Sequence, residues 1–202
     1  MRIGVLGTGE VGRAIGGKLA ALGHDVMLGS RDPAQKQAAF SGIENLRCGS
    51  NEQAAAHGEW IVNALRGESA PDILARCALD DKILIDIANY DSAVDQPIAV
   101  PLGELLQEKF PRVRLVKTLN SVSAHLMVDP AGLPHRHSVF IAANDDAAKH
   151  EVTELLKAFG WQDIIDLGDL SACRAMEQLI PLWMRLEAHF DGPHFNLAVV
   201  RA

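Results

Sequence analysis

A glycine-rich turn near the start of the chain restricts the fold more than any other feature. The segment GTGEVG follows a short apolar run and opens a stretch of helical periodicity. Gly7 is placed to make a tight turn, Gly9 to let the backbone approach a diphosphate, and Gly12 to let the helix pack closely on the strand. The start of that helix would offer unpaired N–H groups and the positive end of its dipole. The pattern predicts a dinucleotide-binding turn; the alternative, which Gly16 and Gly17 partly favour, is a glycine cluster that serves helix packing alone.

Short apolar runs alternate with helical patterns along most of the chain, as is typical of βαβ units with a parallel sheet. The first helix carries its apolar side chains on one face and stops at Gly23, where a left-handed residue would end it. We expect strands at residues 2–6, 25–28, 60–63, 83–87, 114–118 and 139–142, with weaker signals at 46–48 and 164–167. The predicted fold class is α/β: a Rossmann-type, doubly wound, mostly parallel sheet with a small C-terminal cap of helix and strand.

The length of 202 residues limits what can follow such a sheet. We expect a dinucleotide-binding domain over residues 1–145 and a small capping segment over residues 146–202, which is too short for a separate helical domain. In that segment we expect a helix at 146–159 and a second at 171–190, bent where Pro181 lacks an amide N–H. The apolar stripe of the second helix exceeds what a small domain must cover, so we also expect a homodimer formed through it.

The charge and cysteine content exclude several classes of partner. Lys and Arg total 19 against 26 Asp and Glu, so the net charge is −7 and no broad positive field can hold a nucleic acid or an anionic membrane. Any bound phosphate must be met locally. The three cysteines are widely spaced and form neither a disulfide framework nor a zinc pattern, and no apolar run is long enough for a signal-peptide core or a membrane span. We therefore expect a cytoplasmic protein without a nucleic-acid or membrane partner.

The residues after the second expected strand, LGSRDP, choose between the two nicotinamide dinucleotides. Ser30 and Arg31 offer a hydroxyl and a planar guanidinium suited to the extra phosphate of NADP. Asp32 lies near the position of an acid that binds the ribose hydroxyls of NAD. It precedes Pro33, however, and fits better as the N-cap of a helix that begins there. We therefore expect NADP(H), with NAD as the alternative.

Four segments give the chain a family resemblance: GTGEVG, the GSR after the second strand, VKTLNSVSA at 116–124 and GDLSACRAMEQLIPLW at 168–183. Together they resemble the NADPH-dependent reductases of the 8-hydroxy-5-deazaflavin coenzyme F420, with the oxidoreductase domains of membrane ferric reductases as cousins. The match runs nearly from end to end. The resemblance implies NADPH bound across the strand ends and a flat, flavin-like acceptor laid against the nicotinamide.

The resemblance also assigns roles by position. It implies diphosphate contacts from the turn, which comprises Gly7, Thr8, Gly9, Glu10, Val11 and Gly12. It implies that Ser30 and Arg31 hold the adenosine phosphate and that Val122 lies beside the nicotinamide. The phosphate-binding lysine of the family aligns with Gln35, so Lys36, one residue further on, is the candidate here. Archaeal deazaflavin enzymes carry a histidine at the position of Asn120, a departure that concerns the acceptor more than NADPH.

Further candidates follow the ends of other expected strands, where parallel sheets usually bind ligands. For NADP(H) they are Ala64, Leu65, Ala88 and Asn89. For the nicotinamide and acceptor pocket they are Asn120, Ser121, Val122 and Ser123. The two serines could hydrogen-bond the nicotinamide amide or the acceptor, or they could cap the turn, and the sequence leaves both roles open.

The sequence singles out no catalytic residue, and the expected chemistry does not demand one. Hydride transfer between two rings requires the donor and acceptor carbons to be held about 3 to 3.5 Å apart, while the cofactors supply the reactivity. The Tyr-x-x-x-Lys pair of short-chain dehydrogenases is absent, because the only tyrosine is Tyr90 and Val94 stands four residues on. Lys117 and Asn120 could mimic the pair of hydroxyacid dehydrogenases, but we expect Lys117 to be a strand lysine with a solvated head.

Two other groups are expected to be structural. His135 and His137 have a spacing that can chelate a metal, but no carboxylates accompany them, so we expect both in an exposed loop at 129–137 and no metal site. Cys173 stands near the start of a helix whose dipole could activate a thiol. We expect it instead to be buried as an apolar side chain.

Three functions remain open. The first is an NADPH-dependent oxidoreductase that moves a hydride to or from a deazaflavin or flavin. The second is a reductase of a small imine or carbonyl, as in the pyrroline carboxylate reductases, whose N-terminal halves look alike but which need a long helical domain after the Rossmann part. The third is a non-catalytic NADPH sensor that reports redox state to a partner protein.

Overall fold

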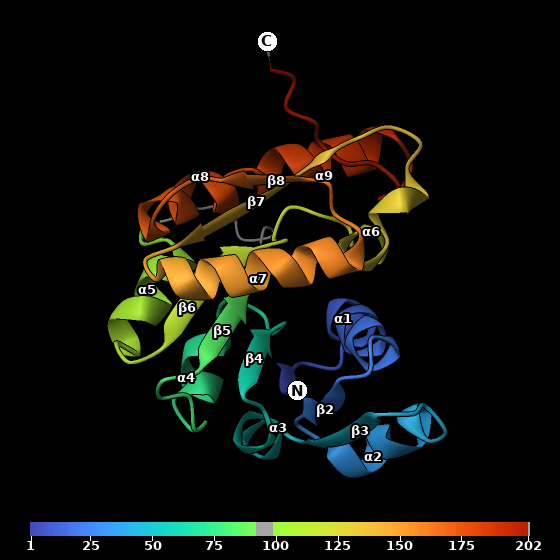
Figure 1. The fold of residues 1–202 in the computed structure, drawn as a ribbon, viewed down its shortest axis with the longest axis vertical. Coiled ribbons are helices and arrows are strands. Elements are labelled where there is room, and N and C mark those ends of the chain that lie inside the picture. The colour runs from blue at the N-terminus through green and yellow to red at the C-terminus, as the bar shows by residue number, and fades with distance from the viewer. Residues whose placement is uncertain (92–98, 202) are drawn as a thin grey trace.

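The computed structural model describes residues 1–91 and 99–201 of the chain. One eight-stranded sheet runs through it in the order β3-β2-β1-β4-β5-β6-β7-β8 (Figure 1). Its strands are Arg2–Leu6 (β1), Asp25–Ser30 (β2), Leu46–Ser50 (β3), Trp60–Asn63 (β4), Ile83–Asp86 (β5), Arg114–Thr118 (β6), Ser138–Ala143 (β7) and Asp163–Asp166 (β8). Every neighbouring pair of these strands is parallel except β6 with β7. The first six follow the order of a doubly wound dinucleotide fold, which confirms the predicted α/β class.

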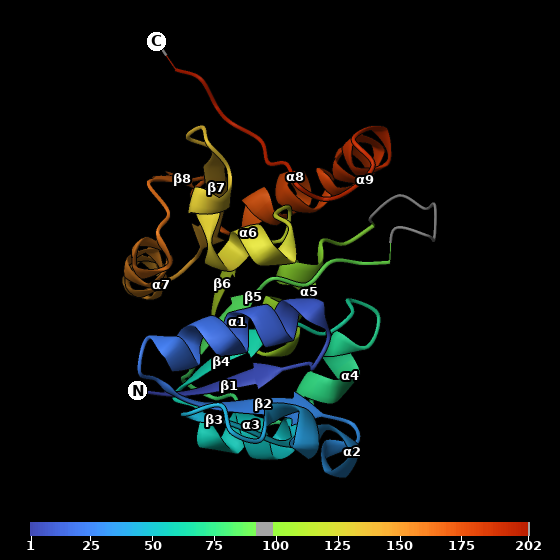
Figure 2. The ribbon, with the colours of Figure 1, turned by 90° about the vertical axis from the view of Figure 1, so that its right-hand side faces the viewer.

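Helices cover both faces of the sheet, as a parallel sheet with two apolar faces requires. One face carries α1 (Glu10–Ala21), α6 (Ala124–Val128) and α7 (Asp146–Phe159). The other carries α3 (Asn51–His57), α4 (Ala70–Leu74) and α5 (Leu102–Lys109), so that α1 and α3 lie on opposite sides of the strands (Figure 2). A short helix, α2 (Pro33–Gln37), follows β2 and packs against β3. None of the helices in the described part of the chain is long and apolar enough to cross a membrane.

Side chains alternate along each strand between two apolar cores, because successive residues of a strand point to opposite faces. In β1, Val5 belongs to the core under α1, whereas Leu6 belongs to the core under α3. In β5, Ile85 and Leu84 divide in the same way. Apolar packing therefore holds the sheet on both faces. The loops that follow the strands start from its carboxyl edge.

The C-terminal part differs from the single bent helix expected at 171–190. A 3₁₀ turn leads into α8 (Cys173–Glu177), and a separate helix, α9 (Ile180–His189), follows. Pro181 lies in the first turn of α9, where its missing N–H would have had no intrahelical partner. The expectation of one helix is wrong, because the proline begins a new helix instead of bending an existing one.

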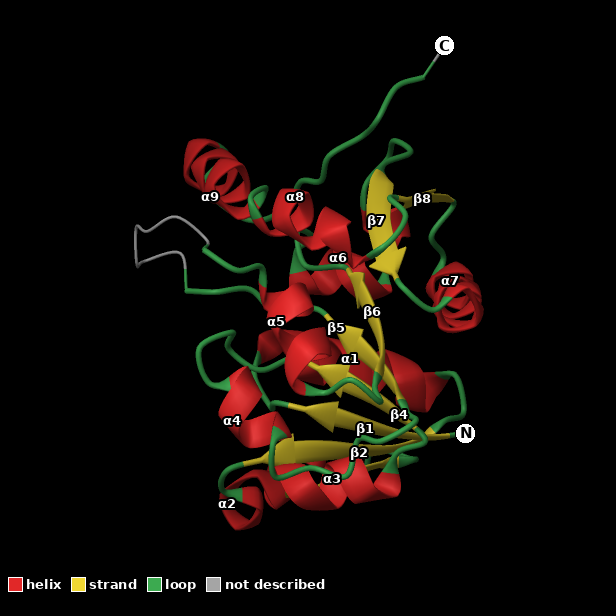
Figure 3. Ribbon diagram, turned by 90° about the vertical axis from the view of Figure 1, so that its left-hand side faces the viewer, coloured by secondary structure: helices red, strands yellow, loops and turns green. Residues whose placement is uncertain are grey.

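The strand expected at 139–142 and the helix expected at 146–159 are confirmed as β7 and α7. The helix α7 begins after Asp145, whose side chain accepts the N–H of Ala148, and ends at Gly160, which has the left-handed φ of +110°. Figure 3 shows α7 and α9 on opposite sides of β7. A boundary between a domain at 1–145 and a cap at 146–202 falls between β7 and α7 and stays a prediction, since β8 continues the same sheet.

The turn-rich stretch at 129–137 is only partly exposed. His135 is exposed, as expected, but His137 is buried. Its Nε2 lies 2.9 Å from the carbonyl oxygen of Pro130, and its ring packs edge-on against Trp161. The expectation of an exposed loop is wrong for His137, because Trp161 comes from beyond α7 and no local pattern reveals it.

Candidate functional site

The site residues expected from the sequence follow five strands that end at one edge of the sheet. The strands β1, β2, β4, β5 and β6 are mutually parallel, so their carboxyl ends meet there. In open α/β sheets, ligands bind outside this edge. The loops that leave it contain residues 7–12, 30–31, 64–65, 88–89 and 120–123. An elongated ligand laid along the edge can contact all five.

The glycine-rich turn forms a cradle at the end of β1. Gly7 has a φ of +111°, which favours glycine, and a Cβ there would lie 2.5 Å from the carbonyl oxygen of Ala64. A Cβ on Gly12 would overlap the carbonyl oxygen of Gly7, so α1 packs directly on the turn. At Gly9, by contrast, nothing beyond the adjoining residues lies within 4 Å of that position, and Gly9, the N-cap residue of α1, leaves the helix start without a side-chain cap. The open position and the uncapped helix start fit a bound diphosphate.

The loop after β2 carries the groups expected to choose NADP over NAD. Asp32 caps α2, because its Oδ1 accepts the N–H of Gln35 at 3.2 Å. This agrees with the cap predicted from Pro33 and engages the carboxylate that could have bound ribose hydroxyls. Ser30 is buried, and its Oγ accepts the N–H of Asp32 at 3.2 Å. Arg31 is exposed and Lys36 is half-buried; both stay predicted phosphate contacts.

A cavity of about 430 Å³ lies beside the turn, within the size range of ligand pockets. Six expected site residues line it: Glu10, Val11, Asn89, Asn120, Val122 and Ser123. Another wall comes from α9, chiefly through Ile180, Trp183 and Met184. The cavity therefore joins the start of α1, the loops after β5 and β6, and the C-terminal part of the chain. The remaining expected residues lie along the sheet edge outside this lining.

Two asparagines connect the loops after β5 and β6. Asn120 Nδ2 donates to Asn89 Oδ1 at 3.0 Å, and Asn89 Nδ2 donates to the carbonyl oxygen of Asn120 at 2.7 Å. Asn120 Nδ2 also donates to the carbonyl oxygen of Met176 in α8 at 2.9 Å. The preceding residue, Leu119, has a φ of +60°, a left-handed conformation that strains a leucine backbone. The strain lies where the chain leaves β6 and turns toward the cavity.

One serine of this loop makes a contact that neither expectation covered. Ser123 lines the cavity, and its Oγ donates to the carbonyl oxygen of Pro193 in the C-terminal segment. It does not cap α6, which begins without a side-chain cap. His125 and His194 stack beside it with ring centroids 5.3 Å apart. Ser123 thus fastens the C-terminal segment to the edge of the cavity, while Ser121 is buried next to it.

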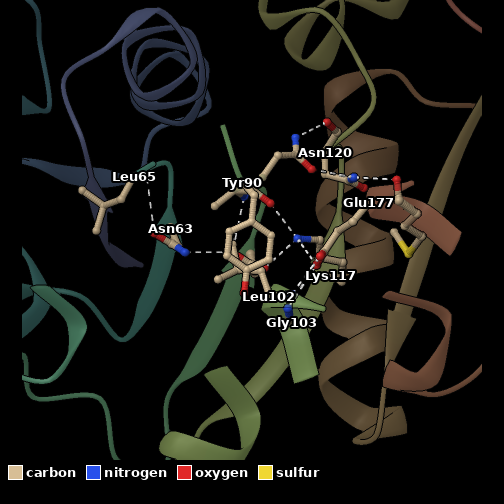
Figure 4. Close-up of polar contacts among 12 residues, drawn as sticks. Asn63, Leu65, Tyr90, Leu102, Gly103, Lys117, Asn120 and Glu177 are labelled. Atoms are coloured by element: carbon tan, nitrogen blue, oxygen red, sulfur yellow. Dashed lines mark hydrogen bonds and ion pairs between the residues drawn. The ribbon is translucent and has the colours of Figure 1, made fainter. Parts of the chain in front are cut away.

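The expectation of a solvated head for Lys117 is wrong. Its side chain is 0% exposed, and its Nζ lies 2.8 Å from Asp86 Oδ2 and 3.1 Å from Glu177 Oε1 (Figure 4). Burial alone would lower the pKa of Lys117, but the two carboxylates raise it above its usual value, so the ammonium stays charged. The physical reason is that β6 lies inside a sheet covered on both faces, where a strand lysine has no route to water.

Two further titratable side chains of this region, Cys173 and Tyr90, are buried or already hydrogen-bonded. Cys173 is buried, as expected, and burial raises the pKa of its thiol to about 12. Tyr90 lines the cavity, but its hydroxyl donates to the carbonyl oxygen of Val100 at 3.2 Å. Val94, which stands four residues after it, lies outside the described residues. Within the described ranges no group of three or more His, Cys, Asp or Glu side chains could hold a metal ion.

Sequence reasoning missed the cavity wall that α9 supplies. Trp183 belongs to the apolar stripe expected on the helix at 171–190, and Met184 was not singled out, yet both line the cavity. It also missed Arg66 and Glu68, which follow β4 and line the same cavity. Arg66 and Glu68 could have been predicted, because they directly follow the expected contacts at 64–65. No local pattern distinguishes a helix that covers a cavity from one that covers another subunit.

Comparisons with known proteins agree with this geometry. The sequence model of a family described as NADP oxidoreductase coenzyme F420-dependent matches residues 2–90. A crystal structure from Arthrobacter sp. FB24, of a protein assigned as an F420-dependent NADP-reductase, is 41% identical, with both chains covered in full and a TM-score of 0.92. The F420-dependent NADP reductase of Methanothermobacter marburgensis is 28% identical over 92% of each chain.

A second group of relatives is larger than this chain. Metalloreductase STEAP2 of Homo sapiens is 31% identical over 95% of this chain, but the match covers 37% of the relative. The chain therefore spans little more than a third of that protein. The full-length match at 41% identity and the family model that covers the glycine-rich turn point the same way. The chain belongs to the family of coenzyme F420-dependent NADP oxidoreductases.

Proposed function

We propose that this protein transfers a hydride between NADP(H) and a deazaflavin or flavin-type acceptor. The observation that carries the proposal is the cavity that joins the start of α1 to the loop after β6 and is walled by α9. A dinucleotide held at the glycine-rich turn and at Ser30 and Arg31 would bring its nicotinamide to Val122. The rest of the cavity would then face the acceptor.

The side chains around the cavity suit a flat, apolar ring. Val122, Ile180, Trp183 and Met184 supply apolar and aromatic surface, and the Trp183 ring is braced by Phe195 with ring centroids 5.5 Å apart. When bound, the nicotinamide supplies the hydride chemistry. The residues of this chain hold the two rings together and keep water away from them.

The arrangement of proton donors favours a flavin-type acceptor over a small imine or carbonyl. Reduction of an imine or ketone needs a positioned proton donor. Burial, followed by the charges of Glu177 and Glu68, raises the pKa of Tyr90, and its hydroxyl is engaged with Val100. Lys117 does not line the cavity among the residues described. Hydride transfer between two rings does not require either group.

The charge of the cavity lining bears on how the acceptor enters. The described lining carries the acidic residues Glu10, Glu68, Asp91 and Glu187 against a single basic residue, Arg66. Like charges repel a phosphate or carboxylate brought close to them. We therefore propose that the ring of the acceptor enters the cavity and that any anionic tail stays outside.

One experiment separates the three candidate functions. Purified protein is mixed with NADPH and, in turn, with oxidised F420, FAD, FMN, riboflavin and a panel of carbonyls and imines, while the nicotinamide absorbance is followed. Turnover with a deazaflavin or flavin supports the proposal. Turnover with a carbonyl or imine alone would show a reductase of small imines or carbonyls. Tight NADPH binding without turnover would indicate a sensor.

We also propose that the protein forms a homodimer through α9 and acts in the cytoplasm. None of the ten residues of α9 is buried. Its apolar side chains Leu182 and Met184 are 50% and 39% exposed, and the neighbouring Phe190 is 59% exposed. An apolar surface of this kind commonly marks an interface. Light scattering should give twice the mass of one chain, and Leu182→Glu should return the monomer. The three unpaired cysteines suit a reducing compartment.

A further inference from the structure

Three charged side chains meet in the interior between the sheet and the C-terminal helices. Asp86 and Lys117 are 0% exposed at their side chains, and Glu177 is 1% exposed. The Nζ of Lys117 contacts Asp86, Glu177 and the carbonyl oxygen of Ala88, the last at 2.6 Å. Two of these contacts are hydrogen bonds and the third, to Glu177, is an ion pair, so three oxygen atoms surround the ammonium group. Lys117 is therefore engaged in the interior, and it does not line the cavity among the residues described.

Burial of such a group has a cost that apolar side chains would avoid. Taking charged groups out of water is unfavourable, and apolar residues of similar volume often serve stability as well or better. Buried ionic groups are retained in some proteins because they specify one arrangement of the elements that carry them. In this protein the cluster contacts elements on two sides, the nucleotide loops and the C-terminal helices.

On the nucleotide side, the cluster reaches the loops after β4 and β5. Asp86 Oδ1 accepts the side-chain N–H of Asn63 at 2.8 Å and the backbone N–H of Ala88 at 3.3 Å. Asn63 Oδ1 in turn accepts the backbone N–H of Leu65 at 3.3 Å. Ala88 and Leu65 are expected NADP(H) contacts, so the hydrogen bonds connect the buried cluster to the cofactor edge (Figure 4).

On the acceptor side, Glu177 joins α8 to the start of α5. Its carboxylate accepts the N–H of Leu102 at 2.8 Å and that of Gly103 at 3.1 Å. The two helices are in direct contact, because a Cβ on Gly103 would lie 2.5 Å from Cys173 Sγ. The carboxylate thus accepts two N–H groups at the start of α5, which have no partner within that helix, and forms an ion pair with Lys117.

The position of Glu177 makes it the anchor of α9. Glu177 is the last residue of α8, and α9 begins three residues later at Ile180. No residue of α9 is buried, so its own packing does little to fix its direction. Beyond α8, Trp183 of α9 and Phe190, the residue that follows α9, contact the ring of Phe195 and help to brace the helix.

From these contacts we infer that Glu177 and Lys117 are positioning residues, which hold the α9 wall of the cavity at a fixed distance from the nicotinamide loops. The inference rests on the proposed function, because it assigns that wall to the acceptor. Loss of the Glu177 charge leaves the glycine-rich turn and the loop after β2 intact. It loosens the junction between α8 and α9, and with it the placement of Trp183 and Met184.

The test is Glu177→Gln, which keeps the size of the side chain and removes its charge. NADPH affinity should stay within about twofold, because the diphosphate and adenosine contacts are untouched. The KM for the acceptor should rise about 10- to 100-fold with a smaller change in kcat, because the wall that contacts the acceptor ring is no longer held in its binding position. Glu154→Gln, an exposed acid that pairs with Lys157 on α7, is the matched control and should change neither constant.

Hydrogen exchange in the NADPH-bound protein supplies a readout that does not depend on turnover. Amides at 178–190 should exchange faster in Glu177→Gln than in the unchanged protein, while those of β1 should not. If Glu177→Gln does not fold, Glu177→Asp keeps the charge but withdraws it by one methylene group, and the same split between acceptor KM and NADPH affinity is expected.

Two results would overturn the inference. One is a loss of NADPH affinity as large as the rise in acceptor KM, which would assign the cluster to the cofactor or to the whole fold. The other is unchanged exchange at 178–190 in both variants. If the unchanged protein turns over no acceptor, the proposed function fails, and the exchange experiment still decides the positioning role.

Discussion

The two ends of the site are built by different means. The diphosphate end consists of consecutive backbone groups at 7–12, where space for the chain is set by glycines. The proposed acceptor end is supported by buried side chains of β5, β6 and α8, which meet through hydrogen bonds and ion pairs and accept backbone N–H groups of α5. The first should tolerate changes of nearby side chains but not an added Cβ. The second should tolerate small changes of volume but not a lost charge.

The largest effect is expected at the acceptor end, from Lys117→Met. It leaves Asp86 and Glu177 buried without their counter-charge, and breaking a buried ion pair in this way costs about 3 to 5 kcal/mol. The free energy of unfolding from denaturant titration measures the loss. Lys157→Met is the control, because Lys157 pairs with Glu154 at 2.7 Å while both side chains are more than half exposed. That change should cost no more than about 1 kcal/mol. Equal losses in the two variants would contradict the comparison.

At the diphosphate end, two glycines of α1 form a matched pair. Gly12→Ala should destabilise the protein by about 3 kcal/mol and abolish tight NADPH binding, because its Cβ would overlap the carbonyl oxygen of Gly7. Gly17→Ala should stabilise by about 0.5 to 1 kcal/mol, since nothing outside the backbone of its own helix lies within 4 Å of the added Cβ and alanine favours a helix. Thermal unfolding with and without NADPH reports both effects. The two substitutions should change the unfolding temperature in opposite directions. A Gly12→Ala variant that is stabilised and still binds NADPH would show that the glycine-rich turn does not bind the diphosphate.

The diphosphate end could be predicted from the sequence better than the acceptor end, because its contacting residues lie closer together along the chain. The approach of Gly12 to Gly7 and the Asp32 cap of α2 involve neighbours within a few positions, so residue spacing reveals them. Lys117 meets Glu177, and His137 meets Trp161, across long stretches of chain. Local composition carries no information about such partners.

One signal for Lys117 was nevertheless present in the sequence. A strand expected in the middle of a parallel sheet has both faces covered by helices, so a lysine there should be buried and should need an acidic partner. Asp86, at the end of the neighbouring strand, was within reach of that argument. The break between α8 and α9 was not, because Pro181 fits the first turn of a helix as well as a bend inside one.

The adenosine contact at the diphosphate end gives a smaller, selective effect. Arg31→Ala should weaken NADPH binding by about 1.5 to 3 kcal/mol through the loss of a charge-assisted hydrogen bond, and should leave NADH nearly unchanged. Calorimetry or fluorescence titration with both cofactors measures the ratio. Arg47→Ala removes an exposed arginine that pairs with Asp25 and should alter neither affinity. Equal loss for NADPH and NADH would show that Arg31 does not read the extra phosphate.

The smallest effect is expected outside both ends of the site, at the junction of β7 and α7 that contains Asp145. The bond from Arg114 to Asp145, with the N–H of Ala148, lowers the pKa of Asp145 to about 2. Because this value lies below the ordinary value of about 4, the contribution to stability is present above pH 4 and is lost as pH falls toward 2. Both side chains are about one-third exposed, which limits the contribution to less than about 1 kcal/mol.

Asp145→Asn isolates that charge, since asparagine can still cap α7. The difference in unfolding free energy from the unchanged protein should be largest at pH 7 and should shrink steadily below pH 4. Asp146→Asn, whose side chain is 94% exposed, provides the neighbouring control. A difference that stays constant down to pH 2.5 would show that the charge plays no part and that the junction is held by its backbone, as the diphosphate end is.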